Sequence, residues 1–188
     1  MRFSAYSLGF TLALALALVP FTGIAQASDA PKDKVASAAK PSAKPSAKTS
    51  VKWVPLENGV KNVESSKRYL FVSVYTDWCG YCKKLNAVTF KSAPVVAELD
   101  KNFESVRLNA ESEAVVIWKG KKMSSRALAT LWGVEGFPTL LFLNRKGEIV
   151  GSFASYVEPE LMIKLLTYIS SGARERKVTF DQYLEGKS

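Results

Sequence analysis

The two cysteines of this 188-residue chain lie in one short motif, Trp-Cys-Gly-Tyr-Cys at residues 78–82. Residues 69–75, just before it, are mostly aromatic or branched at Cβ, which is typical of a buried strand. Residues 79–90 are expected to form a helix, with Leu85 and Val88 facing the core. A spacing of three at the start of a helix places both sulfur atoms on one face, close enough to form a disulfide.

The two cysteines are expected to have different roles. Cys79 lies in the first turn of the predicted helix, where free N–H groups and the helix dipole favour the thiolate, the nucleophilic form. Lys83 and Lys84 add positive charge, while Asp77 opposes it. Cys82, one turn into the helix, is expected to be more buried than Cys79 and to act as the resolving thiol.

Three other interpretations of the cysteine pair remain open beside the redox one. A purely structural disulfide would close a very short loop and stabilise the fold by only about 2 kcal/mol, against about 3 kcal/mol for a 15-residue loop. Half of a metal site is disfavoured because the chain has no His and no further Cys. A redox-inactive relic used for binding is the third. We therefore expect no metal and no cofactor.

The N-terminal residues predict export. No charge occurs between Arg2 and Asp29, residues 8–19 are almost wholly apolar, and residues 25–27 supply the small side chains of a signal-peptidase site. We predict a signal peptide at 1–27 that is cleaved after Ala27. The alternative is an uncleaved anchor, because residues 3–27 are long enough to cross a bilayer core of about 30 Å. Both imply an oxidising compartment, the periplasm.

Residues 28–50 are predicted to form a disordered linker. Ala, Lys, Ser and Pro make up 19 of these 23 residues, so the segment has little to bury and stays extended. A weak electrostatic tether to an anionic membrane or cell wall is the alternative role, since five Lys oppose two Asp. The folded domain is then expected at 51–188.

The rest of the chain alternates strands and helices, then adds a hairpin and a last helix. This order predicts an α/β fold, a three-layer sandwich with a mixed central sheet. A strand-like insertion at 115–118 is expected to pack on the body, with a partner-docking surface as the alternative. The other predicted segments are helices at 94–100, 124–132 and 158–169, and strands at 103–108, 139–143 and 148–153, the last two joined by a turn at 144–147.

Two motifs together resemble the thioredoxin superfamily: residues 72–82, and Gly-Val-Glu-Gly-Phe-Pro-Thr-Leu-Leu-Phe at 133–142. The chain is most similar to exported bacterial thioredoxins, such as those that serve sulfur-oxidation enzymes, and to the C-terminal domain of DsbD. The resemblance implies a thioredoxin fold in which the Phe137–Pro138 bond is cis and faces the disulfide. It also implies that substrate binds at Trp78, Gly80, Tyr81, Phe137 and Pro138.

The chain departs from the family pattern at several positions. Ser73 stands where thioredoxins carry a buried Asp that assists proton transfer from the second cysteine, and Arg107 stands where that Asp has its Lys partner. Ala87 replaces a helix-kinking Pro, and Ser155 replaces a groove-lining Gly. The resemblance therefore implies catalysis, but not the family's rate or pH dependence.

The predicted function is that of an exported thiol-disulfide oxidoreductase, a reductase of protein disulfides that acts through Cys79 and Cys82. A redox-inactive binding module and an oxidase or isomerase are the alternatives. The expected partners are protein disulfide substrates and a membrane electron donor of the DsbD/CcdA type. A monomer is expected, and a net charge of +9 is too modest to predict nucleic-acid binding.

Overall fold

The computed structural model describes residues 50–186. The signal peptide predicted at 1–27 lies outside the described residues, as does the linker predicted at 28–50 except for its last residue. The described part contains a four-stranded sheet with the order β2-β1-β5-β6. Its strands are β1 (Tyr69–Tyr75), β2 (Phe103–Asn109), β5 (Thr139–Leu143) and β6 (Ile149–Ala154).

The sheet is mixed. β1 pairs in parallel with β2 and antiparallel with β5, and β5 pairs antiparallel with β6. Outside the cysteine motif, the first and last residues of every predicted strand and helix differ by at most two positions from those of an observed element. The predicted α/β sandwich is therefore confirmed.

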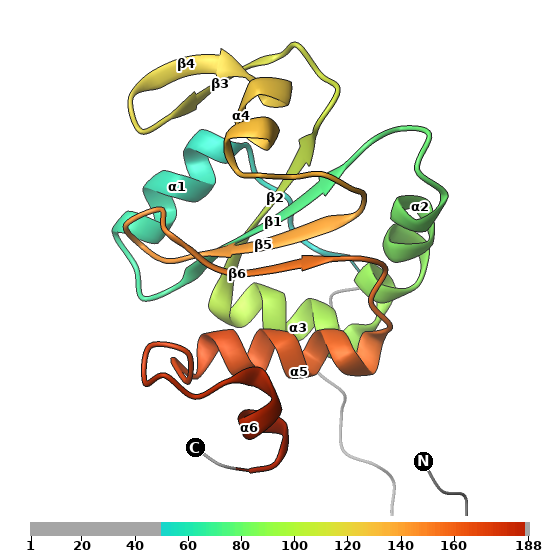
Figure 1. Cartoon of the computed structure of the whole chain (residues 1–188), viewed down its shortest axis with the longest axis vertical. Helices are drawn as coiled ribbons and strands as arrows, with labels where there is room; N and C mark the ends of the chain where they lie inside the picture. The colour runs from blue at the N-terminus through green and yellow to red at the C-terminus, as the bar shows by residue number, and fades with distance from the viewer. Residues whose placement is uncertain (1–49, 187–188) are drawn as a thin grey trace, which may run out of the picture. The chain divides into compact units, whose positions relative to one another are not determined.

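Helices cover both faces of the sheet and complete three layers (Figure 1). One core cluster joins the sheet to α3 (Ala93–Asn102) and α5 (Pro159–Ser170). The other joins the opposite face to α1 (Leu56–Glu64) and α4 (Ser125–Leu131). Among the described residues, no helix has the length and apolar composition that crossing a membrane requires.

The central strand β1 is buried on both faces, which explains why its sequence is apolar at every position except Ser73 rather than alternating. Leu70, Val72 and Val74 belong to the cluster with α1 and α4, whereas Phe71 belongs to the other. The ring of Phe71 is fully buried, and its centroid lies within 6.5 Å of four other aromatic rings. These are the rings of Trp53, Phe90, Phe103 and Phe142.

The insertion at 115–118 forms strand β3 (Val115–Trp118), which pairs antiparallel with β4 (Lys121–Ser124) in a separate two-stranded sheet. Its Trp118 is buried and makes an edge-to-face contact with Trp132, with ring centroids 5.1 Å apart. The prediction that this segment packs on the body is confirmed.

Three elements are not predicted from the sequence: α1, β4 and α6 (Phe180–Leu184). Helix α1 contains Gly59, a residue of low helix propensity. The structure explains this glycine, because a Cβ at Gly59 would lie 2.9 Å from side-chain atoms of both Leu70 and Val106. Helix α1 can therefore approach the sheet only if this position has no side chain.

The predicted helix at 79–90 is partly wrong. Helix α2 (Gly80–Ala87) begins after Cys79, and a separate 3-10 turn follows at Thr89–Lys91. Val88, expected in the core, is 41% exposed, because the helix ends before it and the backbone changes direction there. Phe90 fills the core in its place.

We expect Phe71→Ala to lower the free energy of unfolding by about 3–5 kcal/mol, because it removes a ring that the neighbouring aromatic side chains cannot replace. Urea denaturation followed by circular dichroism measures this. Val115→Ala, at a position 66% exposed, is the matched control and should change stability by less than about 0.5 kcal/mol. Similar values for the two variants would contradict the proposed packing.

Candidate functional site

Cys79 and Cys82 form a disulfide at the N-terminus of α2, with their Cα atoms 5.2 Å apart. Cys79 is the N-cap of the helix, and its Sγ accepts a hydrogen bond from the Cys82 backbone N–H at 3.0 Å. The sulfur thus takes the place that a Ser or Asp oxygen commonly occupies at a helix start. Strand β1 and the short loop after it bring the chain to this point.

The two cysteines do not differ in burial. Cys79 is 4% exposed and Cys82 is 3% exposed, so the expectation that Cys82 would be more buried is wrong. What distinguishes Cys79 is its position at the N-cap, where an amide N–H points at its sulfur and the positive end of the helix dipole is nearest.

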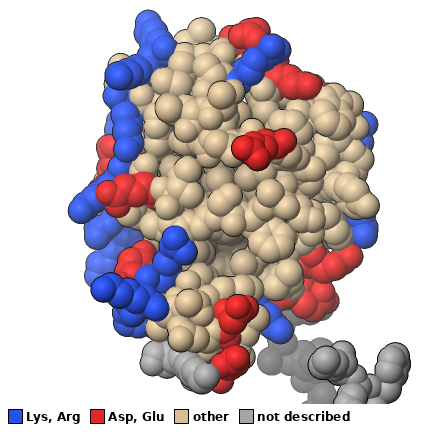
Figure 2. Space-filling model, viewed as in Figure 1, with Lys and Arg blue, Asp and Glu red and all other residues tan. Residues whose placement is uncertain are grey.

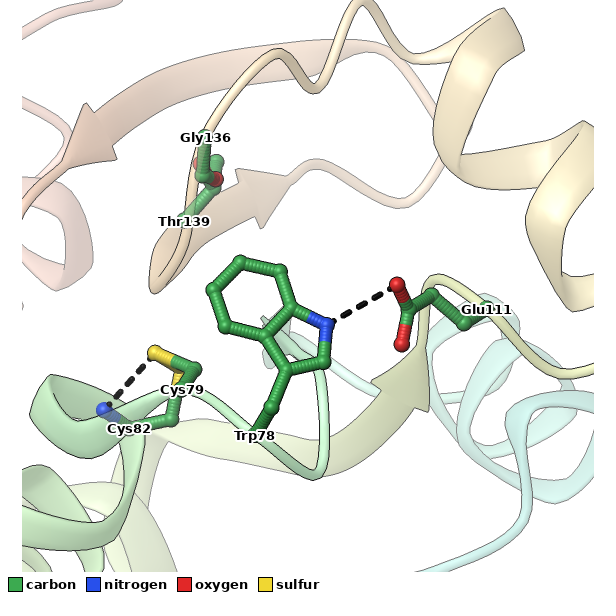
Figure 3. Close-up of a disulfide and its surroundings, with 6 residues drawn as sticks. All are labelled: Trp78, Cys79, Cys82, Glu111, Gly136 and Thr139. Atoms are coloured by element: carbon green, nitrogen blue, oxygen red, sulfur yellow. Dashed lines mark hydrogen bonds between the residues drawn. A yellow bond between two sulfur atoms is a disulfide. The ribbon is translucent and has the colours of Figure 1, made fainter.

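Trp78 projects beside the disulfide and is 66% exposed. Its ring packs edge-to-face on Phe137, with centroids 6.0 Å apart, and its indole N–H donates to a carboxylate oxygen of Glu111 at 2.9 Å. Figure 3 shows the indole between the disulfide and Glu111, below the segment that carries Gly136 and Thr139. Two contacts therefore hold this exposed ring in one orientation.

Glu111 was not among the predicted site residues. It follows β2 by two positions, and β2 runs parallel to β1, so both strands end at the same edge of the sheet. Asn109, at the end of β2, also reaches the site and donates its side-chain N–H to Asp77 at 3.0 Å. The only signal available in the sequence was the order of the two strands, which predicts that the residues after each strand lie close together.

The Phe137–Pro138 peptide bond is cis and lies directly before β5. Pairing of Val74 with Thr139 places this bond at the end of β1 from which the cysteine motif continues. The hydroxyl of Thr139 donates to the Gly136 carbonyl at 2.7 Å and fixes the loop. A Cβ at Gly80 would meet no atom within 4 Å, so the space beside this residue is open.

Ser73 is buried in β1 and pairs in register with Arg107 of β2. The two side chains point to the same face of the sheet because paired residues of neighbouring strands share a face. The Arg107 guanidinium lies over the ring of Tyr75 at 4.3 Å, and among the described residues its Nε has no hydrogen-bond partner. At these two positions the carboxylate–ammonium pair of thioredoxins is replaced by a hydroxyl and a cation that stacks on an aromatic ring.

Residues 50–186 contain no group of three or more Cys, Asp or Glu side chains arranged to hold a metal ion. The arrangement of the site is instead suited to thiol chemistry. It combines a disulfide at a helix start, an exposed aromatic ring beside it and a cis-proline loop at the same edge of the sheet.

Comparison with known proteins agrees with this arrangement. A family model described as a thioredoxin-like domain matches residues 56–170, which include the whole central sheet. The chain belongs to the thioredoxin-like family. The fold implied by the two sequence motifs is therefore confirmed.

Curated relatives of this family member are named protein disulfide isomerases. A protein disulfide isomerase-like 5-2 from Oryza sativa is 32% identical over 106 residues, covering 50% of this chain and 22% of that protein. The protein disulfide-isomerase erp38 of Neurospora crassa is 36% identical over 86 residues, covering 46% of this chain and 20% of that protein. The match thus spans about a fifth of the length of these relatives.

Solved structures share the fold at low sequence identity. A thioredoxin-fold protein from Helicobacter pylori superposes with a TM-score of 0.54 at 17% identity, covering 69% of this chain and 91% of that one. A thioredoxin from Thermus thermophilus gives a TM-score of 0.54 at 21% identity, covering 67% and 93%. These likenesses support the fold alone.

We expect iodoacetamide to modify Cys79 at least about tenfold faster than Cys82 in the reduced, folded protein near neutral pH, because the N-cap position favours the thiolate. Brief labelling followed by mass spectrometry of the peptides measures both rates. The reduced protein in denaturant is the control, where the two rates should converge. Equal rates in the folded protein would show that the helix start does not activate Cys79.

Proposed function

We propose that this protein is a thiol-disulfide oxidoreductase that reduces disulfides of other proteins. The observation that carries the proposal is the Cys79–Cys82 disulfide at the start of α2, beside the loop that contains Pro138. A disulfide across four residues is a weak structural crosslink, since the loop that it closes is short. Its place among open and aromatic surface groups favours exchange with a client. The protein disulfide isomerases among its relatives support the same class of chemistry.

The reaction begins from the reduced protein. The Cys79 thiolate attacks one sulfur of the client disulfide; the client S–S bond breaks, and the other client sulfur leaves as a thiolate that takes a proton from water. Cys79 is now joined to the client by a mixed disulfide. The Cys82 thiol then gives its proton to water and attacks the Cys79 sulfur; the bond between Cys79 and the client breaks, and the client sulfur leaves as a thiolate that takes up a proton. The client, now a dithiol, has gained two electrons, and the protein has lost two and carries the Cys79–Cys82 disulfide.

The residues around the disulfide are proposed to hold the client. An extended client segment lies along Trp78, Phe137 and Pro138 and pairs with the Phe137 backbone, as in strand addition. Gly80 leaves room above the helix start, and Tyr81 borders the same surface. Cys82 has no carboxylate in β1 to take its proton, because Ser73 occupies that position. Water is the proton acceptor that remains in this proposal.

The proposed direction is reduction. Strong oxidants of the superfamily stabilise their first thiolate with a His in the central dipeptide. Here that place is held by the uncharged Tyr81, and the chain has no His. The Asp77 carboxylate near Cys79 disfavours further negative charge at the sulfur. Isomerisation is the second candidate, favoured by the names of the curated relatives.

The proposed site of action is the periplasm, supported by the apolar start of the chain and the small residues before Ser28. A reductant in that compartment must receive electrons from inside the cell. We therefore also propose a membrane donor of the DsbD/CcdA type as its partner, with the protein acting as a monomer.

We expect the protein to accelerate insulin reduction by dithiothreitol, and Cys79→Ser to abolish the acceleration, because no nucleophile then remains at the helix start. Cys82→Ser should accumulate mixed disulfides with insulin, visible on non-reducing gels, because the second thiol that resolves them is missing.

The double variant Cys79→Ser/Cys82→Ser controls for non-covalent binding and should form no adduct. Equal trapping by the two single variants would contradict the assigned roles. If the unchanged protein does not accelerate the reaction and its disulfide resists reduction in the folded state, it is a binding module.

The reduction potential of the cysteine pair tests the proposed direction of electron flow. In equilibrium with glutathione, we expect a reduction potential nearer to the value of about −270 mV for thioredoxin than to the value of about −120 mV for DsbA. Tyr81→His is the informative variant and should move the potential towards the oxidising end, because a cationic ring would stabilise the Cys79 thiolate. A potential at the oxidising end in the unchanged protein would replace the reductase proposal with an oxidase or isomerase.

A further inference from the structure

A second aromatic group borders the disulfide, apart from Trp78. Tyr81 lies between the two cysteines in sequence, is 66% exposed and stacks on Tyr156, which follows β6. The ring centroids are 6.3 Å apart, and the ring planes are inclined by 30°. A large exposed aromatic side chain with one face already covered offers its other surface for contact.

Polar contacts hold Tyr156 in place. Its hydroxyl donates to one carboxylate oxygen of Glu158 at 2.8 Å, and the other oxygen of Glu158 lies 3.3 Å from the Lys84 ammonium. That ammonium also lies 4.1 Å from the centre of the Tyr156 ring. The Tyr156 hydroxyl, with Lys84, lowers the pKa of Glu158, while Glu158 raises the pKa of Lys84. Both shifts favour the charged forms of these groups, which contact the hydroxyl and the face of the Tyr156 ring.

Strand pairing places the two aromatic groups at one edge of the sheet. Thr139 of β5 pairs with Ala154 of β6. Phe137 precedes Thr139 by two residues and Tyr156 follows Ala154 by two residues, so both lie beyond the same end of the hairpin. Phe137 supports Trp78, and Tyr156 supports Tyr81. Each of the two aromatic residues of the motif, Trp78 and Tyr81, thus has its own aromatic support from the loops at this edge.

The two rings of the stack are uncharged side chains, and the Lys84 ammonium beside them is paired with Glu158 at 3.3 Å, so this pair presents little net charge to a client. On the face seen in Figure 2, most Lys and Arg side chains gather along the left edge; at the right, where α2 lies in Figure 1, a few charged side chains of both signs border an uncharged surface. Contact with an apolar side chain is therefore the interaction that Tyr81 and Tyr156 favour.

We propose that the Tyr81–Tyr156 stack, held by Glu158 and Lys84, selects protein clients that carry an aromatic side chain beside the reacting cysteine. This inference rests on the proposed reductase function and names its substrate class. Tyr81 contacts the client, and Tyr156 is a positioning residue that keeps the Tyr81 ring in place. Disulfides without such a side chain, among them glutathione disulfide, lack this contact.

The test compares two disulfide-linked peptides that differ only in Phe or Gly next to the cysteine. The readout is the ratio of their kcat/KM values in dithiothreitol-driven reduction. We expect the unchanged protein to prefer the Phe peptide, and Tyr156→Ala to lower the ratio by between about twofold and tenfold, through the KM of the Phe peptide. Tyr156→Phe keeps the ring and should retain most of the ratio.

Tyr183→Ala is a matched control, because Tyr183 packs on Tyr168 between α5 and α6 and not at the disulfide. It should leave the ratio unchanged. An unchanged ratio in Tyr156→Ala, or no preference in the unchanged protein, would overturn the inference while leaving the reductase proposal intact. No reduction of either peptide by the unchanged protein would overturn both. A parallel loss for both peptides in Tyr156→Ala would assign Tyr156 to stability, against the inference.

Discussion

Strand β1 hydrogen-bonds to β2 on one side and to β5 on the other, and side chains pack on both of its faces. Its register decides which distant segments meet at the site. Val74 pairs with Thr139, so the cis bond at Pro138 lies at the end of β1 that leads to Cys79. Tyr75 pairs with Asn109, so the segment that carries Glu111 reaches the same edge. A shift of one residue would turn the strand's core side chains to the wrong face and separate these groups.

The electrostatics of the cysteine pair come mainly from the helix start. Cys79 is the N-cap and receives the Cys82 N–H, while the Asp77 carboxylate is engaged with Asn109. Strand β1 carries Ser73, and not a carboxylate, at the position where thioredoxins have a buried Asp. Helix termini act through fixed backbone groups, so the activation that we expect at Cys79 does not depend on the protonation of a neighbouring side chain. The exchange chemistry proposed here therefore relies more on geometry than on a buried acid.

The loops around the disulfide supply the exposed aromatic rings of the site and the carboxylates that orient them. The sheet positions them, and in the proposed function their side chains form the surface that a client meets. Glu111 orients Trp78 from the loop after β2, and Glu158 orients Tyr156 from the loop after β6. Each carboxylate acts through an aromatic ring rather than on the sulfur. Polar contacts that fix exposed rings reduce the conformational entropy lost when a client binds.

The sequence alone determined where the strands of the central sheet lie along the chain, the cysteine pair and the motif around Pro138, because strand hydrophobicity, turns and short motifs are local properties. It did not reveal α1, whose Gly59 has its reason only in the close approach to the sheet. The sequence also misplaced Val88. The equal burial of the two cysteines and the contacts of Glu111 and Tyr156 depend on strand register and loop packing. These join residues far apart in the chain, so only the tertiary structure decided them.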